Sequence, residues 1–273
     1  MSETAPVSKA DFFDRLYSVF QELGTHFWDF VTLVGGVGFL IRDTFLAAIT
    51  EPVDWREIVR QVYGIGVQSM ALVNLIAVFT GMVMALQFIV GLNRFGLELY
   101  TGQVVGIAIT RELGPVLTAL MVASRVGSGI AAELGSMAVS EQVLAIEAMG
   151  GNPVAKLVVP RVLVATLITP LLTVVAIFVG IAGGMVVTML EAGISASLYL
   201  DQVKQTVEVE DFFSGIGKTV FFGFLIGTIA CYKGLMTSGG TRGVGHATTQ
   251  TVVICAVAVF VSDFFLTKLF LLF

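Results

Sequence analysis

Residues 110–135 form the stretch TRELGPVLTALMVASRVGSGIAAELG. It has the length and apolar content of a membrane-spanning helix. It also carries four charged residues, Arg111, Glu112, Arg125 and Glu133. A helix that begins near Gly102 would place Arg111 about 14 Å along its axis, close to the middle of a ~30 Å hydrocarbon core. Because a charge that faces lipid at this depth is costly, the pattern predicts contacts with a cavity or with other helices.

The second half of this stretch is a run of small residues that repeats every four positions. One row consists of Ala123, Gly127, Ala131 and Gly135, and the neighbouring row of Ser124, Ser128, Ala132 and Ser136. Two later apolar segments carry the same kind of spacing, with the pairs Gly180 and Gly184, and Gly223 and Gly227. Small residues let helices approach closely inside a membrane, so all these positions predict helix-packing seams, within one chain or between copies.

The composition indicates an all-α integral membrane protein. Of the 273 residues, 56% are hydrophobic and only 13% are charged, whereas a soluble domain averages about 25% charged residues. The net charge of −5 argues against nucleic acid as a partner. Cys231 and Cys255 both lie in apolar runs, which favours a packing role over a disulfide or a metal site.

Five long apolar segments predict five transmembrane helices, and the loops between them alternate in charge. One side collects most basic residues and the other side most acidic ones, so the positive-inside rule predicts a cytoplasmic N-terminus and an external C-terminus. The basic residues of the first side are Arg56, Arg60, Arg125, Lys156, Arg161, Lys233 and Arg242. The five segments are approximately 66–92, 102–131, 158–190, 212–232 and 247–273.

The first 61 residues have a different character. Residues 11–34 place apolar, largely aromatic side chains at steps of three and four, which is typical of an amphipathic helix in the membrane interface. A soluble amphipathic helix docked on a partner is the alternative. Residues 35–50 are apolar but short and contain several glycines, which favours a re-entrant or interfacial segment over a full span. We therefore expect an N-terminal interfacial segment, 1–61, and a membrane domain, 62–273.

Residues 214–219 read SGIGKT, which is close to a phosphate-binding loop. The full motif needs a glycine at the position of Phe212, and the segment enters an apolar span instead of following a strand. We therefore expect no nucleotide site here, and a separate subunit would have to hydrolyse ATP.

A short helix is expected in the loop between the second and third predicted spans. Val139, Val143, Ile146 and Met149 share one helical face, whereas Ser140, Glu141 and Glu147 do not, and Pro153 ends the helix. Such a helix could lie on the membrane surface or dock on a partner.

Several blocks of sequence resemble the MlaE (YrbE) permease family, whose members are the membrane subunits of ABC-type lipid transporters. The blocks are RELGPV (111–116), ASRVGS (123–128), AELGSM (132–137), SEQVLAIEAMGGNP (140–153) and GVGHATTQTVV (243–253). The blocks follow one another in the same order as in the family, which makes the match specific. The resemblance runs from about Val62 to the C-terminus, so 62–273 is expected to be an MlaE-like permease domain, whereas the first 60 residues match only in general character.

The resemblance implies a function and a set of partners. The family moves phospholipids between the inner and outer membranes and maintains outer-membrane lipid asymmetry. We therefore expect a homodimer in the bacterial inner membrane with a periplasmic C-terminus. Its expected partners are an ABC ATPase, a periplasmic MCE-domain protein and a STAS-domain protein. The chain itself would be no enzyme and hold no cofactor, since ATP and Mg would bind to the ATPase.

The resemblance also implies site residues. Arg111 and Glu112 would face a lipid cavity between two copies, beside Pro115. Phe95 falls where the family can carry a tyrosine, so a hydroxyl contact to the head group is missing here. The short helix would be the coupling helix that contacts the ATPase through Glu141, Gln142, Ile146, Met149 and Gly150.

Other interpretations of the same residues stay open. Arg111 and Glu112 point about 100° apart on a helix, so each could pair with a different helix and hold the bundle together. They could also form the ion site of a secondary transporter or channel, although no internal repeat supports that class. A third alternative is a structural anchor for an MCE protein. Asp263, in the last span, is expected to be structural.

Overall fold

The computed structural model describes residues 9–52, 54–270 and 272, although for residues 9–23, 25–27, 29 and 30 it places the backbone only. The described residues form helices and no strand, as the composition predicts. Six helical stretches are long and apolar enough to cross a membrane, which confirms an all-α integral membrane protein. These stretches are Val31–Thr50, Trp55–Asn93, Glu98–Val139, Val154–Glu191, Val209–Leu235 and Gly240–Phe270.

The N-terminal helix differs from the expectation. Helix α1 runs without a break over Lys9–Thr50, through the glycines that we expected to interrupt residues 35–50. The glycines therefore do not break the helix, since glycine is tolerated inside membrane helices, and the interfacial placement of residues 35–50 stays a prediction. The amphipathic face predicted for residues 11–34 depends on side chains that lie mostly outside the described residues. The chain divides into two units, Met1–Asp43 and Thr44–Phe273, and the following paragraphs concern the second.

The second unit is an antiparallel bundle in which several spans contain a π-helical turn. The first predicted span is preceded by α2 (Trp55–Gln61) and consists of η1 (Val62–Val67, π) and α3 (Gln68–Asn93). The second consists of η2 (Glu98–Tyr100, 3-10), α4 (Thr101–Ala108), η3 (Ile109–Leu113, π), α5 (Gly114–Val122), η4 (Ala123–Gly127, π) and α6 (Ser128–Val139). The rest comprises α7 (Gln142–Ala148), η5 (Val154–Val158, π), α8 (Val159–Glu191), α9 (Ala196–Thr206), α10 (Val209–Leu235) and α11 (Gly240–Phe270).

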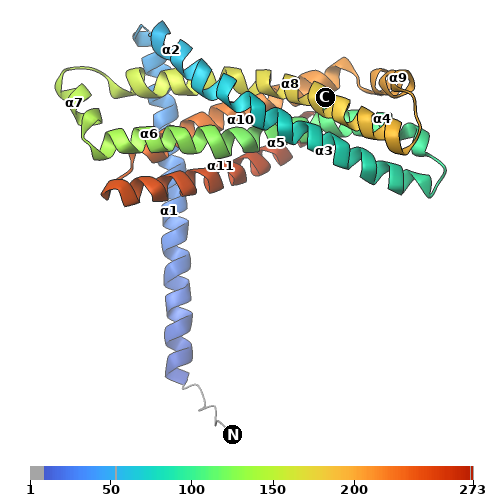
Figure 1. The fold of residues 1–273 in the computed structure, drawn as a ribbon. Helices are drawn as coiled ribbons and strands as arrows, with labels where there is room; N and C mark the ends of the chain where they lie inside the picture. The colour runs from blue at the N-terminus through green and yellow to red at the C-terminus, as the bar shows by residue number, and fades with distance from the viewer. Residues whose placement is uncertain (1–8, 53, 271, 273) are drawn as a thin grey trace. The chain divides into compact units, whose positions relative to one another are not determined.

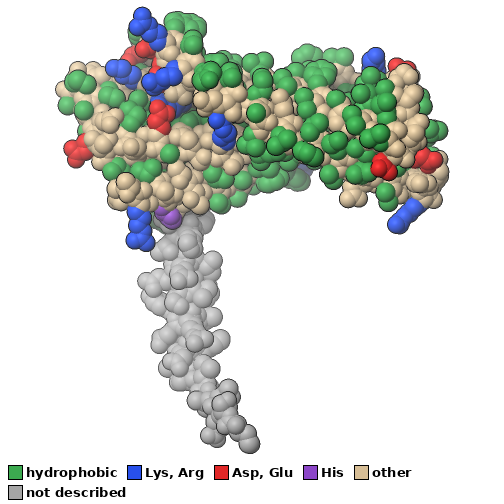
Figure 2. All heavy atoms as spheres, in the orientation of Figure 1, with side chains coloured by type: hydrophobic (Ala, Val, Ile, Leu, Met, Phe, Trp, Pro, Cys, Tyr) green, Lys and Arg blue, Asp and Glu red, His purple; other side chains and the backbone are tan. Residues whose placement is uncertain are grey.

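The two short helices α7 and α9 mark opposite ends of the bundle (Figure 1). At the α7 end, Asn152 Nδ2 donates to Glu51 Oε1 at 2.9 Å, which joins the loop after α7 to the loop before α2. At the α9 end, the backbone N–H of Gly102 donates to Gln202 Oε1 at 3.2 Å, which joins the start of the second span to α9. Figure 2 shows mainly apolar side chains between these ends, as a lipid-facing surface requires.

Glycines bring α8 against its two neighbours, α3 and α10. A Cβ on Gly81 of α3 would collide with the carbonyl oxygen of Gly180 of α8, and one on Gly223 would lie 2.5 Å from the Ala165 carbonyl oxygen of α8. Backbone atoms occupy these positions, so no larger side chain fits without separating the helices. The seams predicted at the two glycine pairs are confirmed, and they lie within one chain.

The small-residue row of the second span is also a packing seam. Ala123, Gly127, Ala131 and Gly135 are all buried. A Cβ on Gly127 would touch Ile226 of α10 and Thr251 of α11, at 3.5 and 3.7 Å. This row therefore holds α10 and α11 against the second span, whereas the neighbouring row, with Ser124 and Ser136, is more exposed.

Candidate functional site

Arg111 and Glu112 lie in the π-helical turn η3, which Pro115 helps to explain. Pro115 has no N–H to donate to the carbonyl of Arg111 four residues earlier, and its ring crowds that carbonyl. The helix widens: Gly114 N–H bonds to the Ile109 carbonyl, five residues back. The freed Arg111 carbonyl oxygen instead accepts from Lys218 Nζ at 3.3 Å. Single π turns inside α-helices are frequent at functional sites.

The side chain of Arg111 forms an ion pair with Asp211 in the first turn of α10. Arg111 Nε donates to Asp211 Oδ1 at 2.6 Å, and Arg111 Nη2 lies 2.5 Å from the same oxygen. The other carboxylate oxygen of Asp211 accepts from the N–H of Glu208 at 3.0 Å and closes the cap of α10. The Arg111 side chain is 45% exposed and that of Asp211 only 7%. The acid is thus fixed in the bundle, whereas the cation is accessible.

Glu112 pairs with a different residue of the same helix. Lys218 Nζ donates to Glu112 Oε1 at 2.8 Å and to Thr267 Oγ1 of α11 at 2.7 Å. Asp263 Oδ1 lies 3.3 Å from the same ammonium group. The Lys218 side chain is 2% exposed and that of Glu112 is 41% exposed. A buried lysine between two carboxylates therefore ties together the second span, α10 and α11.

One face of α10 is shaped to meet η3. Asp211, Gly215 and Lys218 recur at steps of four and three, so they lie on one side of the helix. A Cβ on Gly215 would collide with the carbonyl oxygen of Thr110 and would lie 3.3 Å from Pro115 Cγ. The glycine and lysine of the SGIGKT segment thus serve helix packing and ion pairing, and the segment lies inside α10 as expected.

Sequence reasoning missed the partners of Arg111 and Glu112. Asp211 lies just before the fourth predicted span, and the sequence assigns no partner to Asp211, Lys218 or Asp263. All three are charged residues inside an apolar span or at its edge, and this is the feature that could have pointed to them. Asp211 and Lys218 are also spaced so that they lie on one face of a helix.

The other charges of the second span also have partners. Arg125 Nη1 donates to Ser69 Oγ at 2.6 Å, at the start of α3. At the α7 end, Arg161 Nη2 lies 2.9 Å from Glu133 Oε1, and Arg161 Nη1 donates to the Leu157 carbonyl at 2.6 Å. Both charges therefore contact other helices, one of the two alternatives that the sequence left open.

The other two residues predicted to line the cavity, Pro115 and Phe95, lie in different environments. Pro115 is buried against α10, next to the charged pair. Phe95 lies in the turn after α3, where its ring is exposed and takes no part in the ion pairs. A role for these residues in lipid binding stays a prediction.

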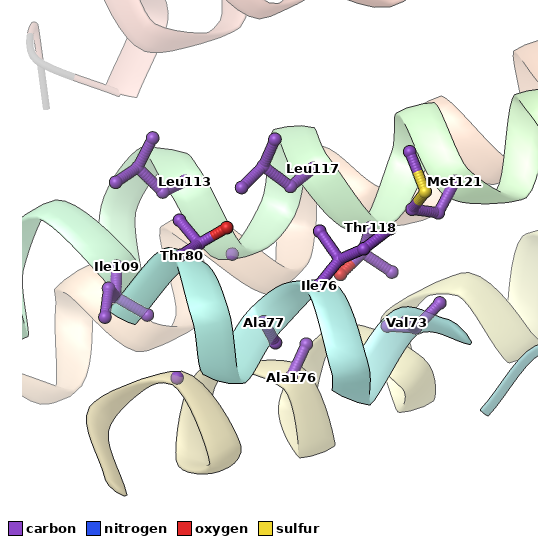
Figure 3. A pocket seen from close by; sticks show the side chains of 12 residues that line it. Val73, Ile76, Ala77, Thr80, Ile109, Leu113, Leu117, Thr118, Met121 and Ala176 are labelled. Carbon is purple, nitrogen blue, oxygen red and sulfur yellow. The ribbon is translucent and has the colours of Figure 1, made fainter. Parts of the chain in front are cut away.

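A small pocket lies between α3, the second span and α8. Figure 3 shows side chains of these three elements around it, among them Thr80, Leu117 and Ala176. Its volume is about 20 Å³, whereas pockets for small-molecule ligands span roughly 300–1,000 Å³. It has no room for a lipid chain.

The short helix α7 is held between two left-handed residues. Glu141, before the helix, has φ 60°, and Gly150, after it, has φ 78°. Val143 and Ile146 are half-buried, and Ile146 lies against Gly151, whereas Leu144 and Met149 are exposed. The predicted apolar face is therefore divided: Met149 turns outward with Glu141, Gln142 and Gly150, and Ile146 turns toward the protein.

Comparison with known proteins identifies the family. The family described as Permease MlaE matches residues 58–269. A probable ABC transporter permease protein of Rickettsia conorii is 36% identical over 255 residues, which cover 93% of this chain and 98% of the relative. The intermembrane phospholipid transport system permease protein MlaE of Haemophilus influenzae is 34% identical over 248 residues, 90% of this chain and 95% of the relative.

A plant relative extends the comparison. The chloroplastic protein TRIGALACTOSYLDIACYLGLYCEROL 1 of Arabidopsis thaliana is 37% identical over 234 residues, 86% of this chain and 67% of the relative. The family match covers most of the chain and includes the charged η3 turn, α7 and all of α10. This multi-pass membrane protein therefore belongs to the MlaE family of ABC transporter permeases.

Proposed function

We propose that this chain is the permease subunit that moves phospholipids between the inner and outer membranes of a bacterium and so maintains outer-membrane lipid asymmetry. The Haemophilus influenzae relative is named as a permease protein of an intermembrane phospholipid transport system, which supports the substrate class. The chain is proposed to be non-catalytic, with ATP and Mg bound by a separate ATPase.

The accessible charges of η3 carry this proposal. Arg111 and Glu112 each keep roughly half of their side chain exposed although their partners, Asp211 and Lys218, are buried. Each of these charges is held in place by a buried partner and is still exposed on one side, where it can bind a polar head group. The guanidinium of Arg111 offers a fork of donors that fits a phosphate. Glu112 would bind an amine head group or orient Arg111 of a second copy.

A second copy of the chain is part of the proposal. The pocket between α3, the second span and α8 holds about 20 Å³, far below the volume of a lipid. This pocket therefore does not hold two acyl chains. We place the lipid cavity between two protomers, with Arg111, Glu112, Pro115 and Phe95 contributed by each.

The remaining partners follow the two ends of the bundle. The α7 end carries Arg56, Arg60, Lys156 and Lys233, which by the positive-inside rule favours the cytoplasm. We propose that the ATPase, with a STAS-domain protein, binds there through Glu141, Gln142, Ile146, Met149 and Gly150. The MCE-domain protein would then meet the periplasmic α9 end, near the C-terminus.

Photo-crosslinking from position 111 tests the cavity. A photoreactive phenylalanine derivative at position 111 of the full complex is expected to give lipid adducts in native membranes. The same derivative at Phe222, which is fully buried, is the matched control and should give protein adducts only. Exclusively protein–protein adducts from position 111 would contradict a lipid cavity there.

Substitutions in α7 test the ATPase contact. Glu141→Lys and Met149→Trp are expected to release the ATPase or to uncouple its ATP hydrolysis from lipid movement. Glu191→Lys, an exposed acid at the opposite end, is the control and should leave ATPase binding unchanged. Unchanged co-purification and lipid-stimulated ATP turnover in both α7 variants would show that the contact lies elsewhere.

A further inference from the structure

We propose that Asp211 is the resident counter-ion of Arg111: it balances the arginine when no lipid is bound and keeps phosphate binding weak enough for release. This inference rests on the proposed function, because it assumes that Arg111 contacts a phosphate-bearing lipid. It adds a positioning residue to that site and a reason for its arrangement.

Asp211 is held so that it cannot follow a ligand. One oxygen, Oδ1, receives Arg111 Nε and Nη2 at 2.6 and 2.5 Å. The other oxygen, Oδ2, receives the N–H of Glu208 at 3.0 Å, in the capping box that begins α10. With its side chain only 7% exposed, the carboxylate is fixed to the backbone of the bundle. It therefore determines where the guanidinium lies.

The arginine keeps a second edge for a ligand. A guanidinium has five N–H donors in a planar fork, and the contacts with Asp211 occupy the side that carries Nε. Nη1 and the outer hydrogen of Nη2 form the end of the fork, which can bind two phosphate oxygens at once. Because 45% of the Arg111 side chain is exposed, this end can be reached while Asp211 stays in place.

The carboxylate also sets how strongly a phosphate is held. Arg111 and Asp211 together carry no net charge, so a phosphate meets a polarised donor fork instead of an isolated cation. Without the carboxylate, Arg111 would keep its full positive charge, and an anion at the open end of its fork would be bound more tightly. Transport requires binding that is favourable enough for entry and weak enough for exit. A built-in counter-ion meets that requirement.

The test is equilibrium binding to the purified full-length chain. The probes are a fluorescent phosphatidylethanolamine and a diacylglycerol with the same acyl chains and fluorophore. Asp211→Asn is expected to bind the phospholipid about fivefold to tenfold more tightly and to release it more slowly, since the gain is that of one strengthened charge-assisted contact. Diacylglycerol affinity should not change.

Two controls assign the effect to the ion pair. Glu210→Gln removes an exposed acid from the same turn and should leave both affinities unchanged. The double variant Arg111→Gln with Asp211→Asn should lose the gain in affinity, because the carboxylate acts only through Arg111.

Asp211→Ser is a second test of the same charge. It removes the charge but keeps a short oxygen for the cap, and it should reproduce the tighter phospholipid binding.

The outcomes separate this inference from the proposed function. Phospholipid affinity that is unchanged or lower in Asp211→Asn, or an equal gain for diacylglycerol, would overturn the counter-ion role alone. Loss of the folded protein in both charge-removing variants would also overturn it, because the pair would then be structural. If Arg111→Gln binds phospholipid as well as the parent chain, the phosphate contact of the proposed function is itself wrong.

Discussion

The two arginine–acid pairs of the second span are built in opposite ways. At the α7 end, the arginine is buried and the acid is open: the Arg161 side chain is 1% exposed and that of Glu133 is 48% exposed. At the α9 end the order is reversed, since Asp211 is buried and Arg111 is open. The residue types and the short separations are the same, so a list of ion pairs would not distinguish them.

The difference separates a structural pair from a site that can bind a ligand. The Arg161 side chain is 1% exposed and contacts Glu133 and the Leu157 carbonyl inside the bundle, so it offers no open edge to a ligand. Arg111 presents part of its fork to the outside. Removing the exposed residue of a pair leaves a buried charge without a partner, which is expensive. Removing the buried residue leaves an exposed charge that water hydrates, so it costs less.

The largest effect is expected at Lys218, whose ammonium lies between two acids. Lys218→Met would leave Glu112 and Asp263 facing each other without a cation and should lower the free energy of unfolding by about 3–5 kcal/mol. Adding Asp263→Asn removes one of the two negative charges and should restore part of the loss. Thermal unfolding in detergent, followed by circular dichroism, measures both.

Lys268→Met is the control for Lys218, because it removes an exposed lysine near the end of α11. It should have little effect on the unfolding temperature. Equal losses in the two variants would mean that burial between the acids adds nothing, and the comparison of buried and exposed partners would break down.

The next effect concerns the α7 end. Glu133→Gln removes the charged partner of a buried arginine and should cost about 1–3 kcal/mol. Arg161→Leu leaves only a half-exposed glutamate, which water can solvate, and should cost less. The order of the two unfolding temperatures is the measurement, with Glu147→Gln on the exposed side of α7 as control. The reverse order would show that solvent access does not determine the cost.

Much of this fold could be predicted from the sequence because membrane spans leave local signals. Apolar length gave the spans of the second unit, and the rows of small residues gave the seams of α8 and of the second span. The continuity of the helix over residues 35–50 was harder to predict, because glycines weaken a helix in water but are tolerated in membrane helices.

The partners of the site could not be predicted in the same way. Pairing Arg111 with Asp211 and Glu112 with Lys218 requires two helices about a hundred residues apart to be adjacent and correctly rotated. Periodicity gives the face of one helix but not its neighbour. The π turn at η3 also changes the direction of both side chains, and the sequence offered only Pro115 as a hint of it.

A smaller effect tests the reversed pair at the α9 end. Arg111→Gln strands the buried carboxylate of Asp211 and should lower the free energy of unfolding by about 1–2 kcal/mol, since the Glu208 N–H still stabilises the carboxylate. Asp211→Asn leaves an exposed arginine and should cost less. Chemical unfolding of both variants in micelles gives the comparison, and a larger loss in Asp211→Asn would contradict it.

The smallest effect concerns a buried polar group that has no charged partner. Tyr199 of α9 is fully buried, and no described residue hydrogen-bonds its hydroxyl oxygen, which lies close to Gly184. Burial raises the pKa of Tyr199 above its ordinary value of 10.0. Above that pH the unfolded chain releases the phenol proton while the folded chain keeps it, so stability falls as the pH rises, by up to about 1.4 kcal/mol per unit. Tyr199→Phe should remove this part of the alkaline loss.

At neutral pH the phenol is protonated in both states, so only the desolvated hydroxyl counts. Tyr199→Phe should then be stabilising by about 0.5–1 kcal/mol, because a buried hydroxyl without a partner costs free energy. Tyr63→Phe, at an exposed tyrosine, is the matched control and should change neither the neutral nor the alkaline unfolding temperature. The informative quantity is the difference between each variant and the parent chain at pH 7 and above 10. If Tyr199→Phe destabilises the protein at pH 7, the hydroxyl stabilises the folded chain, and the argument from its missing partner is wrong.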